Sequence, residues 1–390
     1  MRKFLCIAAL LICAAACIYP FDPDLGEAPK GILVVEGDII VGGTTIIRLG
    51  TMESINSGAR HSDAPSGMTA EQAAAHVWVE DSDGGVYEGH LADNRSPQFI
   101  IDTENAPADK EFRVCVEIYD ARYSSDWSPA LQGPEIKDIV FTPNDRSVFV
   151  CVSLDGGPEA TGYVALSYDE TWEFHAEYTL EYVVDTASWT VVIPMNPPRQ
   201  ENYWCWRSSD NHISYPLDFS GMGSNGVTAY PLFSFYRSDN RNHKKYCVNV
   251  KARTISKKTY QYLSHLDETS SGSGDLFTPN PGELPGNLRC ETDPERQVLG
   301  YITASRITSK RAFMDSRYHI LVRPEIGALS FITQDLYPNY YFAGYLPLAE
   351  NPNHSTEDDL ERLYGWGPMR CYDCVAAGGT KEEPDFWKEQ

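Results

Sequence analysis

Residues 32–49 read ILVVEGDIIVGGTTIIRL, two runs rich in β-branched residues joined by a glycine pair. Two such runs around a short glycine-containing loop are typical of a β-hairpin. Further along, Phe112–Ile118 alternates apolar and polar residues with a period of two, as a half-buried strand does. Together with the turn residues between these strands, the pattern predicts an immunoglobulin-like β-sandwich over residues 31–128.

The rest of the chain keeps the same character. Prolines and glycine in residues 128–134 indicate a linker, and strand-like runs resume after it. We therefore predict a larger β-rich domain over residues 135–346, with one short helix at Lys257–Asp267, where apolar residues recur at helical spacing. The 23 Tyr, 8 Trp and 25 Pro residues agree with a mostly-β fold. Residues 347–390 are expected to form a cysteine-containing C-terminal tail.

The N-terminus has the layout of a secretory signal. Residues 1–16 begin with two positive charges and continue as an apolar run that is too short to cross a bilayer. Three alanines then precede Cys17, which places small side chains where a signal peptidase acts. The segment resembles a bacterial lipobox, so we predict a signal peptide over 1–16, a lipid on Cys17 and an extended tether over 17–30.

Composition and motifs exclude several function classes. The formal net charge of −23 argues against DNA or RNA as a partner, because nucleic-acid binders need a basic face. The nine histidines show no metal-ligand spacing, and no nucleophile elbow is present. The glycine pairs resemble turns rather than phosphate loops. We therefore predict no catalytic residue, no metal and no cofactor, with the N-terminal lipid as the membrane attachment.

One acidic segment supports an alternative. Asp169, Glu170 and Glu173 lie close together in sequence, as the paired carboxylates of a carbohydrate-active hydrolase would. On a strand, however, Glu170 and Glu173 would face opposite sides of the sheet. Solvated acids around a strand anchored by Trp172 are therefore the more favoured interpretation.

Two aromatic clusters are candidates for binding. Tyr and Trp are enriched where proteins hold their partners, and their flat faces also stack on sugars. The cluster at residues 203–206 has the alternation of a strand and is expected to be core. In the second cluster a proline interrupts the pattern, which favours a loop, and core and binding roles are equally compatible with it. The binding candidates of this cluster are Tyr337, Tyr340, Tyr341 and Tyr345.

Cysteine usage agrees with an oxidising compartment. Seven cysteines follow Cys17, so at least one thiol must stay free. Cys371 and Cys374 are compatible with a redox pair, with a zinc site that also uses Cys205 and Cys290, or with structural disulfides. A glycine pair follows too soon for a redox helix, and zinc suits a reducing compartment better. We therefore expect the tail to be joined by a disulfide to Cys205 or Cys290.

Several stretches taken in order resemble one family. They are Leu33–Gly37, Thr45–Leu49, Glu170–Glu173, Cys205–Trp206, Pro285–Leu288, Val298–Ser305, Cys371–Cys374, Gly378–Thr380 and Pro384–Trp387. They resemble a Bacteroidota lipoprotein family known as domain of unknown function 4249, whose members are often encoded beside TonB-dependent outer-membrane receptors.

That family has no established activity. The resemblance implies an outer-membrane, lipid-anchored protein, on either face of the membrane, that works as a non-enzymatic binding or accessory module with a TonB-dependent receptor. The carbohydrate-active hydrolase is the alternative.

Overall fold

A computed structural model describes residues 32–52, 68–93, 96–155, 162–192, 201–221, 226–270, 286–314, 329–352 and 363–388. The predicted signal peptide, the lipidation site Cys17 and the tether lie outside these residues. Strands dominate, and the predicted mostly-β class is confirmed. Within the described ranges, no helix is both long and apolar enough to span a membrane.

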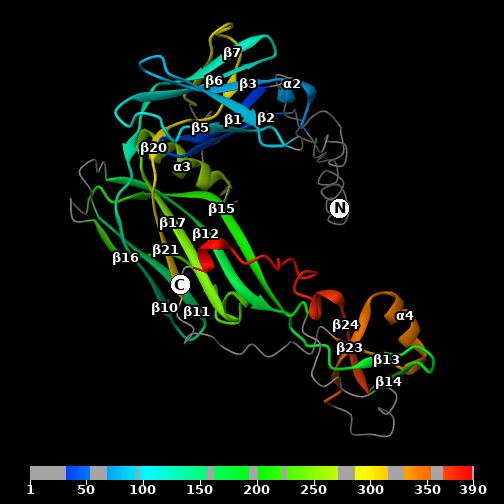
Figure 1. Cartoon of the computed structure of the whole chain (residues 1–390). Coiled ribbons are helices and arrows are strands. Elements are labelled where there is room, and N and C mark those ends of the chain that lie inside the picture. The colour runs from blue at the N-terminus through cyan, green and yellow to red at the C-terminus, as the bar shows by residue number, and fades with distance from the viewer. Residues whose placement is uncertain are drawn as a thin grey trace, which may run out of the picture.

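The first part of the chain forms a folded sheet around one core, here called the first sandwich (Figure 1). Its main strands are β1 Ile32–Ile40, β2 Thr44–Met52, β3 His76–Asp81, β4 Val86–Leu91, β5 Gln98–Asp102, β6 Glu111–Ile118 and β7 Ala121–Ser125. Strand β4 pairs with β3 through its first half and with β5 through its second half, so it carries the sheet from one layer to the other. A Cβ on Gly89, at this crossing, would lie 2.4 Å from the Val77 carbonyl oxygen, which only glycine avoids.

Strands from the late part of the chain complete the first sandwich. They are β18 Leu288–Cys290, which pairs with β7, β19 Val298–Leu299, which pairs with β1, and β20 Ala304–Arg306, which pairs with β1 and with β9 Leu131–Gln132. Ile302, between them, is fully buried in the first core. The predicted ranges 31–128 and 135–346 had placed these strands with the larger domain. The prediction was wrong here because strands of two or three residues show too little periodicity in the sequence to indicate which strands they pair with.

Two further sheets share the core of the second sandwich. One has the order β10 Ile136–Pro143, β11 Ser147–Leu154 and β16 Val227–Tyr236; the other has the order β15 Trp204–Asp218, β12 Tyr163–His175, β17 Lys245–Thr254 and β21 Thr308–Met314. The predicted helix is present as α3, Lys257–Ser270. A second, four-residue helix, α2, Ala70–Ala73, precedes β3 in the chain. An ion pair between Arg253 and Asp38 and a hydrogen bond from Thr254 to the carbonyl of Gln132 join the two sandwiches.

The remaining elements form a small lobe at the end of the molecule opposite the first sandwich (Figure 1). They are the hairpin of β13 Val183–Asp185 and β14 Thr190–Val192, the sheet of β22 Ser330–Phe331, β24 Tyr364–Pro368 and β23 Tyr345–Glu350, the short turn η6 Gln334–Leu336 and the helix α4 Tyr337–Phe342. The lobe therefore takes residues from both predicted ranges 135–346 and 347–390. The stretch read as a loop at Tyr337 is helical, because Pro338 stands in the first turn, where its missing N–H is tolerated.

The tail returns from the small lobe to the second sandwich. After the turn η8, Met369–Cys371, Thr380 exchanges two backbone hydrogen bonds with Trp206 on β15. At its end, Trp387 of the turn η9, Asp385–Trp387, packs its ring 5.4 Å from that of Phe313 on β21. The tail thus runs along the second sandwich as a strap.

Candidate binding site at the small lobe

The four predicted tyrosines all belong to the small lobe, at different depths. Tyr337 is buried, with its ring 4.6 Å from that of Trp366, which is itself completely buried. Tyr340 meets Tyr345 edge to face at 5.1 Å, and both are half-buried in the same cluster. These three tyrosines therefore hold the lobe together, and of the four only Tyr341 adjoins the exposed surface described next.

The exposed surface of the lobe includes an aromatic patch, of which the predicted binding candidates contain only Tyr341. Phe342 is 79% exposed and Leu336 is 38% exposed. The ring of Trp189, on the β13–β14 hairpin, lies 5.8 Å from Phe342 and 6.0 Å from Tyr341. Trp189 and Tyr341 are themselves half-buried against the core of the lobe, and Leu336 is the residue that precedes α4. We call Trp189, Leu336, Tyr341 and Phe342 the tip patch.

Local structure explains why these side chains meet. Phe342 follows the buried Tyr337 by five positions, which on an α-helix is a rotation of about 140° to the opposite side. Burying Tyr337 therefore turns Phe342 outward. This spacing would have predicted the exposure of Phe342 if the stretch had been recognised as a helix. Trp189 comes from a segment more than a hundred residues earlier, and no local pattern connects it to α4.

The backbone of Trp189 is held in an unfavourable conformation. Its φ is +51°, in the left-handed region, which costs a bulky residue about 1 to 2 kcal/mol. The carboxylate of Asp185 accepts hydrogen bonds from the Ala187 N–H and the Ser188 hydroxyl, and Gln334 Nε2 donates to the Trp189 carbonyl at 3.0 Å. These bonds fix the hairpin turn against η6, so the indole is presented in one place.

The lobe is acidic. Among its described residues, 176–192, 329–352 and 363–373, the only basic side chain is Arg370, against six acids: Glu177, Glu181, Asp185, Asp335, Glu350 and Asp373. Hydrogen bonds from the Ser188 hydroxyl and from the Ala187 N–H lower the pKa of Asp185. The hairpin of the tip patch therefore stays negatively charged at neutral pH.

The acidic segment of the hydrolase alternative is occupied by ion pairs. Glu170 and Glu173 are buried and point to opposite faces of β12, as expected. Both oxygens of Glu170 accept hydrogen bonds from Arg241, and one also accepts from the Tyr246 hydroxyl at 2.5 Å. The lysine partners of the other two acids are Lys244 for Glu173 and Lys251 for Asp169. The structure therefore brings these acids together with cations rather than with one another.

Burial and the Glu170 carboxylate raise the pKa of Tyr246 well above its ordinary value. This hydroxyl therefore keeps its proton and serves as a hydrogen-bond donor to Glu170. Arg241 in turn stacks over Trp172 at 4.8 Å, which covers the ion pair with an aromatic ring. The arrangement is that of a structural buried salt bridge.

The junction of the two sandwiches contains a cavity of about 100 Å³. Its charged lining residues are Asp38, Lys251 and Arg253, and both cations are paired, Arg253 with Asp38 and Lys251 with Asp169. Sites for drug-sized molecules are usually about 300 to 1,000 Å³. Across the described part of the chain, no three His, Cys, Asp or Glu side chains are grouped to hold a metal ion.

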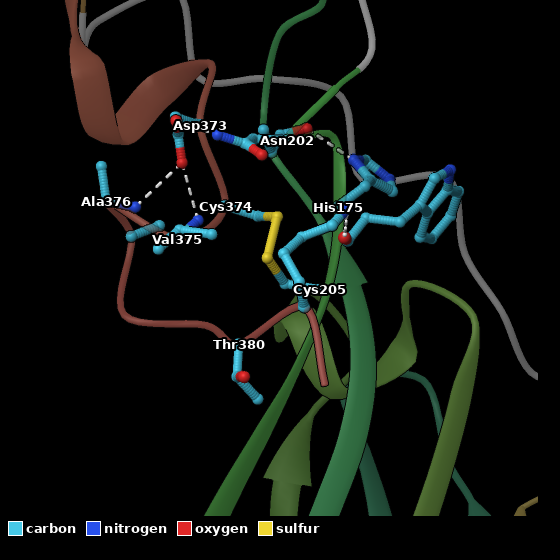
Figure 2. The surroundings of a disulfide bond; sticks show 12 residues. His175, Asn202, Cys205, Asp373, Cys374, Val375, Ala376 and Thr380 are labelled. Atoms are coloured by element: carbon cyan, nitrogen blue, oxygen red, sulfur yellow. Dashed lines mark hydrogen bonds between the residues drawn. A yellow bond between two sulfur atoms is a disulfide. The ribbon is translucent and has the colours of Figure 1, made fainter. Parts of the chain in front are cut away.

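A disulfide fixes the root of the lobe. Cys205 on β15 is bonded to Cys374 in the tail, and both are fully buried (Figure 2). Beside it, the Asn202 amide donates to Asp373, whose carboxylate also accepts the N–H groups of Val375 and Ala376.

The other two predicted disulfide candidates behave differently. Cys290 and Cys371 are buried free thiols, Cys290 in the first sandwich and Cys371 in the lobe. Burial raises the pKa of Cys371, which keeps it as an unreactive thiol. The disulfide that joins the tail to the second sandwich therefore uses one cysteine of the Cys371–Cys374 pair.

Comparison with known proteins gives a family and no activity. No curated protein matches the chain. One family model matches residues 18–311, which include the first sandwich, the β13–β14 hairpin and the second sandwich up to the middle of β21, and end before α4. Because this match covers well over half of the sequence, the chain belongs to the family described as a domain of unknown function, DUF4249.

Proposed function

We propose that this protein is a non-enzymatic binding or accessory module, lipid-anchored to the outer membrane through Cys17, that docks on a TonB-dependent receptor. The tip patch is the observation that supports binding most directly: Phe342 is 79% exposed beside two further aromatic rings. Solvent-exposed aromatic clusters mark protein contacts more often than isolated exposed residues do. The resemblance to envelope lipoproteins supports the location and the class of partner.

The carbohydrate-active alternative is less well supported. A retaining or inverting glycosidase needs two carboxyl groups, about 5 to 10 Å apart, facing one cleft. Glu170 and Glu173 lie on opposite faces of β12, and each is paired with a cation. These ion pairs therefore give both carboxylates a structural role.

The anchor is tested by fractionation of cells that express Cys17→Ser. This change removes the acyl chains, and we expect the protein to move from the outer-membrane fraction to the soluble one, since acyl chains are what stabilise such attachment. Cys13→Ser, within the predicted signal peptide, is the matched control and should leave the protein in the membrane. Sedimentation of Cys17→Ser with the outer membrane would contradict the lipid anchor.

Docking is tested by purification of the full-length protein from envelopes dissolved in mild detergents. We expect a TonB-dependent receptor, identified by mass spectrometry, to co-purify in stoichiometric amount. Recovery of the protein alone in every mild detergent would contradict the proposed function.

A further inference from the structure

The tip patch leaves apolar surface exposed at a site that the fold holds rigid. Burying a Phe side chain stabilises a protein, and Phe342, which is 79% exposed, forgoes most of this gain. Trp189 stays in a left-handed backbone conformation, fixed by the hydrogen bond from Gln334, although a relaxed hairpin would be less strained. Residues held in strained backbone conformations cluster at functional sites.

Ring geometry favours a protein partner over a sugar. The planes of Trp189 and Phe342 meet at 66°, those of Trp189 and Tyr341 at 72°, and those of Tyr341 and Phe342 at 82°. The three rings therefore form a corner rather than a flat platform on which a sugar ring would stack. A projecting aromatic corner fits a concave apolar socket, as central anchors of protein interfaces do.

Charge determines what surrounds that socket. The elements that carry the patch, residues 183–192 and 334–342, contain Asp185 and Asp335 and no Lys, Arg or His. The lobe as described has six acids and one base, and the whole chain has a formal net charge of −23. A second copy of this chain or an anionic lipid surface would be repelled, whereas a basic surface would be attracted.

We propose that the tip patch inserts Phe342 into an apolar socket ringed by Lys and Arg side chains on a protein partner. This inference rests on the proposed function, because it assigns the contact surface and the chemistry of the partner to the docking module. It places the contact on the small lobe, at the end opposite the first sandwich.

The test uses full-length protein with its co-purified partner from detergent-solubilised envelopes. Phe342→Ser should lower partner recovery by about thirtyfold, the usual effect of removing a central aromatic anchor. Tyr236→Ser is the matched control, because Tyr236 on β16 is 70% exposed but lies on the second sandwich, and it should have no effect. Phe342→Leu should restore part of the recovery, because an apolar side chain again fills the socket.

Charge is tested in the same preparation. Asp335→Lys should weaken recovery, whereas Asp145→Lys, at the exposed turn between β10 and β11, should not. Raising the salt concentration should also weaken recovery of the wild-type complex. A photo-crosslinking residue at Leu336 should label a partner segment that contains apolar residues flanked by Lys or Arg.

The outcomes separate the two proposals. If the wild-type protein recovers no partner, the proposed function fails. If the partner is recovered equally with Phe342→Ser, while the variant melts at the wild-type temperature, the docking surface is wrong and the proposed function stands. Crosslinks from Leu336 to a second copy of the chain, or to an acidic segment of the partner, would overturn the assigned partner chemistry.

Discussion

Removing the disulfide between Cys205 and Cys374 is the most informative perturbation of the fold. The double variant Cys205→Ser/Cys374→Ser frees the tail from β15 at a point where both sulfurs are fully buried. What remains at this position are backbone hydrogen bonds, including Cys374 N–H to the Asn202 carbonyl and the pair between Thr380 and Trp206. The stability of the tail attachment depends on how the contribution of the disulfide compares with that of each hydrogen bond.

The two cysteines are separated by 169 residues. On the chain-entropy treatment, closing a loop of this length restricts the unfolded chain by about 5 kcal/mol, an upper value because denatured chains retain structure. Each remaining hydrogen bond contributes about 1 kcal/mol net. The disulfide therefore outweighs any single one of these attachments, and its loss should let the tail detach more readily than the second sandwich unfolds.

Limited trypsin digestion followed by mass spectrometry measures this release. Lys381 in the tail is exposed, and its ammonium group donates hydrogen bonds to the carbonyls of Glu201 and Trp204. We expect cleavage at Lys381 to be faster in the double variant, and urea unfolding to shift to lower concentration. Cys371→Ala is the control, since it leaves the disulfide intact. Equal cleavage rates and equal urea midpoints for the double variant and the wild type would refute the reasoning.

Three further outcomes are expected. Glu170→Gln removes the carboxylate that accepts two hydrogen bonds from Arg241, which keeps its second partner Asp239, and should cost about 1.5 to 3 kcal/mol in urea unfolding. Glu173→Gln, whose lysine partner is half exposed, should cost about 1 kcal/mol or less. Burial opposes ionisation of Asp81, but hydrogen bonds from the N–H groups of Gly85 and Asp83 and from the Tyr87 hydroxyl outweigh burial and lower the pKa of Asp81. The stabilisation by this carboxylate is therefore present above its unfolded pKa and is lost as pH falls through the folded pKa. Thermal melting of wild type and Asp81→Asn from pH 6 down to about pH 3 checks this, and equal falls in the two melting temperatures would contradict it. Ile302→Ala should destabilise the first sandwich by about 2 to 5 kcal/mol in thermal or urea unfolding, and an unchanged protein would contradict the placement of Ile302 in that core.

Local patterns were sufficient for the parts of the fold that are local. The stretch at residues 32–49 forms β1 and β2, paired from Ile32 with Met52 to Asp38 with Ile46, because its apolar side chains and its glycine turn both specify a hairpin. Helix α3 follows from apolar residues at helical spacing. The link from the tail to Cys205 was among the predicted pairings, because a polar tail with paired cysteines needs a covalent attachment.

Non-local assembly was not visible in the sequence. Residues 288–306 return to the first sandwich in strands of two or three residues, and nothing in such short runs indicates a partner more than 150 residues away. The small lobe has the same difficulty, because its hairpin and α4 come from distant segments. Tyr337 and Trp366 form its core, but aromatic residues in a proline-containing stretch are compatible with a surface as well as with a core.

The features that hold the small lobe bear on how it would bind. A contact that orders loose side chains and loops loses about 0.5 to 1.5 kcal/mol for each immobilised side chain. Here the Trp189 turn is already fixed by Gln334, and the root of the lobe by the disulfide and by the Asn202–Asp373 hydrogen bond. In the proposed contact, the tip patch would therefore meet a partner with little backbone freedom left to lose. For that reason we expect a modest apolar area around Phe342 to be enough to anchor the proposed contact, and the acids around it to favour basic surfaces.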